Sequence, residues 1–207
     1  MTFYIAGAGG FGRETLDALR AASPACAAES VFVDEHASVT TVDGQPVVQP
    51  ADAGPGTFVV AIANAAVRQR LASVLVARGL MPGQVFHPRA VISPGADIGH
   101  GCVILANAFV STGTALGAHV QVNYNATVGH DAVLGDFVTV LPGANVAGAV
   151  RIGAQATLGS NACVLQGLRI GPATVVGAGA VVTRDQPSGA VVIGVPARPL
   201  AQPGPGS

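Results

Sequence analysis

The side chains best suited to chemistry in this chain are two neighbours, His130 and Asp131. A carboxylate beside an imidazole orients the ring and stabilises its protonated form, and a histidine held in this way accepts protons from nucleophiles near neutral pH. The alternative is that His130 is an ordinary surface residue and that Asp131 only suits a tight turn. The choice depends on which residues the fold places beside the pair.

A six-residue repeat predicts those neighbours. An apolar residue occupies every sixth position from Phe86 to Val182 without a slip. This period differs from both the helical one and plain strand alternation, and it is typical of a parallel β-helix of hexapeptide repeats. A glycine recurs every eighteen residues, which indicates three hexads per coil, a triangular prism and at least five coils. These glycines are Gly99, Gly117, Gly135, Gly153 and Gly171.

The repeat places small residues against the histidine and the aspartate. Residues eighteen apart lie on adjacent coils, about 4.8 Å apart as neighbouring strands. Gly148 therefore stacks on His130, and Ala149 stacks on Asp131. Small neighbours leave open space beside the imidazole and an exposed backbone N–H, and a base beside a cleft with a free donor is what acyl transfer needs.

The same stacking rule pairs two arginines, Arg151 and Arg169. Like charges at strand spacing repel each other, unless an anion lies between them or the side chains splay into water. The phosphates of coenzyme A are one candidate anion. Both interpretations remain open at this point.

Residues 1–85 follow a different pattern, that of a small βαβ domain. We expect strands at 3–6, 30–33 and 57–62 and helices at 13–22 and 65–78. The segment 7–12 (GAGGFG) matches the GxGxxG turn that presents backbone N–H groups to phosphate, with Asp34 after the second strand. About three strands give room for one nucleotide, so a nucleotide-linked ligand is favoured over NAD and over a purely structural turn. Its phosphate would lie near Gly9 and Gly10, and its ribose or base near Asp34 and Glu35.

Composition excludes several classes of protein. The formal net charge is −1 and no basic stretch occurs, which argues against nucleic-acid binding. No apolar run approaches the ~18 residues needed to cross a bilayer. The sequence opens directly into a strand pattern without a signal peptide, and its three cysteines have no metal-binding spacing. We therefore expect a cytoplasmic protein without a metal site. The predicted domains are 1–85, 86–184 (the β-helix) and 185–207 (a closing strand and a disordered tail).

Taken together, these features resemble the hexapeptide-repeat acyltransferases of the sialic-acid O-acetyltransferase and nucleotide-aminosugar N-acetyltransferase group. The resemblance covers essentially the whole chain. It depends on the segments 5–14 (IAGAGGFGRE), 62–64 (IAN), 123–131 (NYNATVGHD) and 194–197 (GVPA), together with the acidic end of the second strand. It implies a Rossmann-like first domain, a left-handed β-helix, and a homotrimer that binds acetyl-CoA in the groove between two subunits.

The resemblance also implies roles for single residues. His130 would be the general base, Asp131 its acidic partner, Gly148 the source of the oxyanion N–H, and Asn123 a contact to the acceptor sugar. The nucleotide pocket would be formed by Gly9, Gly10, Phe11, Asp34, Glu35 and Asn64. Acetyl-CoA would meet Thr139, Ser160 and Ala178, with Arg151 and Arg169 as candidates for its phosphates. Some members of the group have histidine where Phe11 and Thr139 stand, so polar contacts at those two positions are not expected here.

The sequence thus predicts an acetyl-CoA-dependent N-acetyltransferase that acts on a nucleotide-linked amino sugar, such as a UDP-, dTDP- or GDP-linked 4-amino-4,6-dideoxy sugar. The first alternative is O-acetylation of a sugar hydroxyl, as in sialic acid. The second is a non-catalytic or metal-binding β-helix scaffold, which the presence of several interface histidines would favour. Only His130 has a suggestive setting, so the scaffold is the least favoured interpretation.

Overall fold

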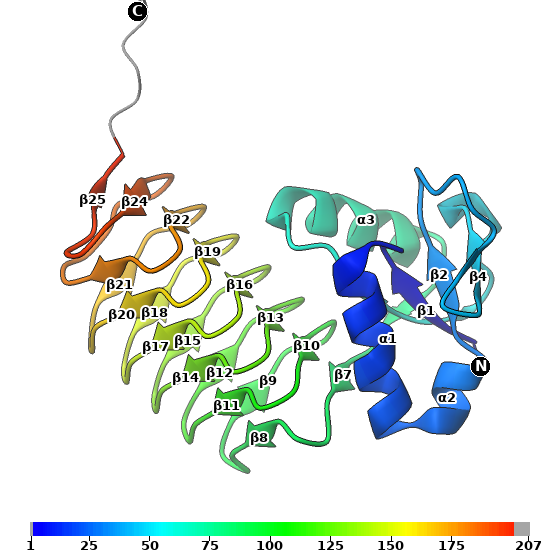
Figure 1. Ribbon diagram of the computed structural model, residues 1–207, viewed down its shortest axis with the longest axis horizontal. Coiled ribbons are helices and arrows are strands. Elements are labelled where there is room, and N and C mark those ends of the chain that lie inside the picture. The colour runs from blue at the N-terminus through cyan, green and yellow to red at the C-terminus, as the bar shows by residue number, and fades with distance from the viewer. Residues whose placement is uncertain (1, 201–207) are drawn as a thin grey trace, which may run out of the picture.

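The computed structural model describes residues 2–200, and it divides into an α/β region and a long β-solenoid (Figure 1). The α/β region has a six-stranded sheet in the order β3-β4-β2-β1-β5-β6. Its strands are β1 (Thr2–Ala6), β2 (Val31–Val33), β3 (Thr41–Val42), β4 (Gln45–Val48), β5 (Gly56–Val60) and β6 (Met81–Pro82). Its helices are α1 (Gly10–Ala22), α2 (Pro24–Ala28), the 3-10 turn η1 (Pro50–Asp52) and α3 (Ala65–Ala77).

The central strands of this sheet are parallel and apolar because both of their faces are covered. The expectation of about three strands was wrong. It missed β6 and the antiparallel pair of β3 and β4, which are short and contain little alternation of apolar and polar residues. The α/β region is nevertheless too small for two nucleotide-binding halves. Before α3, its parallel strands are only β1, β2, β4 and β5.

The solenoid stacks two-residue strands into three parallel sheets, one on each side of a prism. We name one side the docking face, because the α/β region packs on it, and the other two sides by their outward-pointing residues. The docking face contains β7 (Val85–Phe86), β10 (Val103–Ile104), β13 (Gln121–Val122), β16 (Thr139–Val140), β19 (Thr157–Leu158), β22 (Val175–Val176) and β24 (Val191–Ile193), with β25 (Arg198–Pro199) antiparallel to β24. The uncharged face contains β8 (Val91–Ile92), β11 (Phe109–Val110), β14 (Thr127–Val128), β17 (Asn145–Val146), β20 (Cys163–Val164) and β23 (Val181–Val182). The arginine face contains β9 (Asp97–Ile98), β12 (Ala115–Leu116), β15 (Val133–Leu134), β18 (Arg151–Ile152) and β21 (Arg169–Ile170).

The hexapeptide interpretation and the minimum of five coils are confirmed, since every face stacks at least five strands in an eighteen-residue register. The second residue of each hexad strand points into one continuous apolar core, from Phe86 to Val182. Small residues such as Ala126 and Ala144 are fully buried beside it and let the corners close. The predicted tail at 201–207 lies outside the described residues.

The α/β region packs on the docking face, over its first coils (Figure 1). Phe3 and Ile5 of β1 share an apolar cluster with Val85 and Val103, which point outward from the solenoid. A triangular prism places each edge opposite one face. The α/β region and the edge between the uncharged and arginine faces therefore lie on opposite sides of the solenoid. No helix within residues 2–200 is long and apolar enough to cross a membrane.

Candidate active site

His130 and Asp131 form a hydrogen-bonded pair on the edge between the uncharged and arginine faces, in the turn from β14 to β15. The His130 Nδ1 atom lies 2.8 Å from an Asp131 carboxylate oxygen. Asp131 occupies a left-handed corner with φ of 58°, which aspartate tolerates better than most residues. A carboxylate on Nδ1 favours the tautomer in which Nδ1 carries the proton and Nε2 is free to accept another.

Glycines above and below make room for this pair. A Cβ atom on Gly148 would overlap Nε2 of His130, and one on Gly113 would overlap a carboxylate oxygen of Asp131. Neither glycine could carry a side chain without displacing the pair. The predicted stacking of Gly148 on His130 is therefore the contact that fixes the ring position.

The backbone N–H of Gly148 is not used by the fold. Neighbouring coils bond through Ala147 and Ala149, whereas the Gly148 N–H donates to no oxygen within residues 2–200. Gly148 itself is buried beneath the imidazole. An unused donor on the residue that stacks against the His130 ring suits an atom that gains negative charge while Nε2 takes a proton.

Arg151 and Arg169 stand side by side on the arginine face, with β18 and β21 in register. They border a groove of about 690 Å³ that also includes Gly153, Gln186 and Ser188. Both arginines are exposed, and in the part of the chain that the structure describes neither makes an ion pair. The groove combines two guanidinium groups, which suits an anion, although the Asp185 carboxylate accepts the Arg169 backbone N–H at 2.8 Å and is a competing charge beside it.

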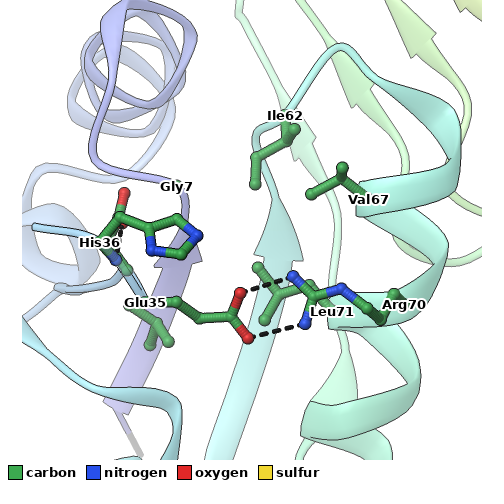
Figure 2. Close-up of a pocket in the computed structure, with 9 residues that line it drawn as sticks. Gly7, Glu35, His36, Ile62, Val67, Arg70 and Leu71 are labelled. Carbon is green, nitrogen blue, oxygen red and sulfur yellow. Dashed lines mark hydrogen bonds and ion pairs between the residues drawn. The ribbon is translucent and has the colours of Figure 1, made fainter.

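A cavity at the carboxyl ends of β1, β2 and β5 contains Asp34 and Glu35, two of the six residues predicted for the nucleotide pocket (Figure 2). Ligands of open α/β sheets commonly bind at such an edge. Arg70 donates two hydrogen bonds to Glu35, of 2.8 and 2.5 Å, and Leu71 lies beside the pair (Figure 2). Ile62 and Val67 also line the cavity. The bonds from Arg70 lower the pKa of Glu35.

The predicted nucleotide residues take different positions around this cavity. Gly9 and Gly10 lie at the start of α1 in open space, because a Cβ atom placed on either would have no neighbour within 4 Å. The turn is therefore accessible to a ligand. Both carboxylate oxygens of Asp34 accept backbone N–H groups, from Ala8 and His36, at 2.8 Å each. Asp34 thus braces the glycine turn as well as lining the cavity.

Asn64 and Phe11 do not line the cavity. The Asn64 side chain caps α3 by accepting the Val67 N–H at 3.0 Å, and Phe11 packs against the apolar cluster beneath α1. Reasoning from the sequence missed Arg70, Ile62 and Val67. Ile62 belongs to the quoted 62–64 segment, and Arg70 lies in the second turn of a helix whose orientation only the fold reveals.

The residues expected to meet acetyl-CoA are not brought together within one chain. Ser160 and Ala178 lie on the edge between the docking and uncharged faces, away from the edge of His130. Thr139 is completely buried beneath α3, where its hydroxyl donates to the Ala63 carbonyl at 3.0 Å. Thr139 has no surface left for a ligand, because the docked α/β region covers it.

A further cavity, of about 510 Å³, lies between part of α1 and the first coils of the solenoid. It contains Glu14, Asp17, His87 and Tyr124. Glu14 and Tyr124 belong to the quoted segments 5–14 and 123–131, but none of the four residues was predicted as a site residue. Asn123, the predicted contact to the acceptor sugar, is the neighbour of Tyr124. Asn123 is nearly buried and its amide donates to the Val140 carbonyl at 3.1 Å.

Known proteins are similar over the full length of the chain. Residues 2–75 match the PglD N-terminal domain family, and residues 149–184 match the family of hexapeptide repeats of succinyl-transferase. The acetyltransferase domain of PglB from Neisseria gonorrhoeae FA1090 is 35% identical, with a TM-score of 0.88 over 96% of this chain and 99% of that one. It is also known in complex with acetyl coenzyme A. A search of curated proteins gives no match.

Two more solved structures are comparably similar. WeeI from Acinetobacter baumannii AYE is 33% identical, with a TM-score of 0.92 over 97% of this chain and all of its own. A variant of perosamine N-acetyltransferase from Caulobacter crescentus, in complex with CoA and GDP-perosamine, is 32% identical, with a TM-score of 0.89 over 98% of both chains.

Proposed function

The chain belongs to the acetyltransferases that join a PglD-type N-terminal domain to a hexapeptide-repeat β-helix, and on this premise we propose that it acetylates the amine of a nucleotide-linked amino sugar. Acetyl-CoA is the donor. The observation that carries the proposal is the His130–Asp131 pair, held between Gly113 and Gly148 beside an unused backbone N–H. Relatives in complex with acetyl-CoA, or with CoA and GDP-perosamine, support both substrates.

The reaction proceeds by direct transfer. The neutral amine of the sugar attacks the thioester carbonyl, and Nε2 of His130 accepts the proton that the amine loses. The Asp131 carboxylate holds Nδ1–H and stabilises the imidazolium. The N–H of Gly148 donates to the oxygen that becomes negative in the tetrahedral intermediate. When that intermediate collapses, the C–S bond breaks and the coenzyme A thiolate leaves with the proton from His130.

The active site is shared between subunits. The α/β region covers the docking face, and His130 stands on the opposite edge, so the solenoid of one chain lies between its own nucleotide pocket and its own base. An acceptor held by one chain must therefore reach the His130 of another. This makes a homo-oligomer necessary, and we propose a homotrimer, as the resemblance implies.

The uncharged face supplies the surface for this assembly. The side chains that point outward from its strands, and those that follow each strand, include no charged residue. They are Val91, Ser93, Phe109, Ser111, Thr127, Gly129, Asn145, Ala147, Cys163, Leu165, Val181 and Thr183. Phe109, Val91 and Leu165 are exposed in the single chain. A flat face that is apolar or neutral loses little by being desolvated against its copy.

Acetyl-CoA fits the groove that such packing forms beside His130. Arg151 and Arg169 extend from that edge along the arginine face and would hold phosphates of the coenzyme. Ser160 and Ala178, on the other border of the uncharged face, would belong to the neighbouring subunit. Thr139 is omitted from this proposal because it is buried beneath α3.

A thiol-release assay tests the proposal. Purified protein is supplied with acetyl-CoA and, in turn, UDP-, dTDP- and GDP-linked 4-amino sugars and free sialic acid. We expect thiol release with at least one nucleotide-linked amine, and His130→Ala should lower turnover by about 10²–10⁴-fold while acetyl-CoA binding persists. Release with sialic acid alone would favour O-acetylation instead. Near-normal turnover of His130→Ala would remove the general base from the mechanism.

Metal analysis separates the enzyme from a metal-binding scaffold. Among the described residues, 2–200, no group of three or more histidine, cysteine, aspartate or glutamate side chains could hold a metal ion. Stoichiometric zinc in the purified protein, together with inactivity toward every amine, would support the scaffold.

A further inference from the structure

Arg68, at the start of α3, is an arginine with no exposed surface. It makes no ion pair within residues 2–200, and all of its hydrogen bonds go to neutral oxygens. Burial lowers its pKa to about 10, so it remains charged at neutral pH. A buried charge without a counterion is costly, and a buried ionic group of this kind is better explained by specificity of geometry than by stability.

The guanidinium joins two parts of the molecule that are far apart in the sequence. On one side it donates to the carbonyls of Ile62 and Ala63, at 2.6 and 3.0 Å. On the other side it donates to the Phe137 carbonyl at 2.5 Å, and to the side chains of Gln121 and Thr139 at 3.0 Å each. A guanidinium presents five N–H donors in a rigid planar fork, whereas a lysine ammonium has only three donors for the five acceptors present here.

The partners of Arg68 strengthen the same junction. Gln121 donates its amide to the carbonyls of Val60 and Ile62, at 2.8 and 3.2 Å, and Thr139 donates to the Ala63 carbonyl at 3.0 Å. The segment 60–64, between β5 and α3, is thus fixed by three buried side chains, Gln121 and Thr139 from the solenoid and Arg68 from α3. Ile62 of this segment lines the nucleotide cavity. Asn64, at the end of the segment, caps α3, and α3 contributes Arg70 to that cavity.

We propose that Arg68, Gln121 and Thr139 act as positioning residues that hold the segment 60–64, and with it the wall of the acceptor pocket, in register with the solenoid. The inference depends on the proposed function for the identity of the ligand. Arg68 touches no substrate in this proposal. It acts through the position of Ile62 and of the first turns of α3.

Thr139 offers the sharpest test because valine has nearly its shape. Thr139→Val removes the bond to Ala63 and the acceptor for Arg68, while Thr139→Ser keeps the hydroxyl. For Thr139→Val we expect the KM for the nucleotide-linked amine to rise about tenfold, because displacements below 1 Å in a binding site already cost this much. The KM for acetyl-CoA should change less than about twofold, and Thr139→Ser should restore the wild-type value.

Arg68→Met and a matched control separate positioning from general stability. Leu80 is a buried residue of the same domain that follows α3, at the edge of the sheet away from the cavity. Leu80→Ala should lower the melting temperature without a change in acceptor KM. Arg68→Met should raise the acceptor KM at least about tenfold, even at temperatures where it is fully folded. An equal rise in the acceptor KM of Leu80→Ala and Arg68→Met would show that Arg68 serves only stability, and would overturn the proposal.

Hydrogen–deuterium exchange tests the positioning without any substrate. Peptides that cover residues 60–68 should exchange at least about fivefold faster in Thr139→Val than in Thr139→Ser, because the hydrogen bonds of Thr139 limit local opening of this segment. Faster exchange combined with a wild-type enzyme that acetylates no nucleotide-linked amine would contradict the proposed function and leave the positioning role standing. Unchanged exchange and an unchanged acceptor KM would refute the positioning role while the enzyme assignment stands.

Discussion

The most direct perturbation of the proposed mechanism is Gly148→Ala. The added methyl group would overlap Nε2 of His130 and lie 2.6 Å from Cε1 and 2.9 Å from Cδ2. Comfortable contact needs about 3.5 Å, so the ring must retreat by about 1 Å. The backbone can accept a side chain here, since Gln166 occupies the equivalent position on the next coil. The ring can move because the His130 side chain is 54% exposed.

The expected cost falls on catalysis and spares the fold. A displacement of about 1 Å in a reacting group costs about 10²-fold in rate, which corresponds to about 2.7 kcal/mol in the activation free energy. The kcat of Gly148→Ala in the thiol-release assay should fall by this factor, with the melting temperature within a few degrees of wild type. Gly54→Ala is the matched control, because the nearest atom to its Cβ would be the Tyr4 hydroxyl at 3.6 Å.

A double-mutant cycle decides whether the effect passes through the ring. In the background of His130→Ala, the Gly148→Ala substitution should cause no further loss, because nothing remains to be displaced. A wild-type kcat in Gly148→Ala alone would refute the reasoning. So would an additional loss of about a hundredfold in the double variant, since the methyl group would then be blocking the substrate instead of moving the base.

Three further predictions concern stability, the coenzyme and assembly. Burial, and secondarily His100, lower the pKa of His119 from 6.5 to about 4, so below pH 6.5 the unfolded chain binds a proton that the folded state does not. As the pH falls from about 7.5 to 5, the free energy of unfolding measured with urea should therefore fall by about 2 kcal/mol more in wild type than in His119→Leu. Arg151→Glu with Arg169→Glu should raise the KM for acetyl-CoA more than about tenfold and spare the acceptor KM. Phe109→Glu should shift the protein to monomers in analytical ultracentrifugation and abolish activity, and a fully active monomer would disprove the shared site.

His119 also illustrates why some residues cannot be interpreted from the sequence. The hexad pattern predicts a surface residue, because it places His119 on an edge of the prism, which is normally exposed. The side chain is instead 4% exposed and stacks between Phe58 and Phe137, with ring centroids 6.0 and 5.0 Å away. Its Nδ1 atom is buried without a hydrogen-bond partner within residues 2–200. The docked α/β region covers that edge, and no pattern within the repeat indicates where another domain will pack.

The sequence by itself determined the solenoid, its register, and the stacking of Gly148 on His130 and of Arg151 on Arg169, because in a repeat each residue meets the one eighteen positions away. Only the tertiary structure decided which part of the molecule covers the docking face. It buried Thr139 and turned Arg68, which no motif distinguishes, into the junction between two domains. It also placed His130 across the solenoid from the cavity of Asp34, Glu35 and Arg70. The physical reason is that local periodicity fixes neighbours along a coil, whereas contacts between domains depend on the shapes of two finished surfaces.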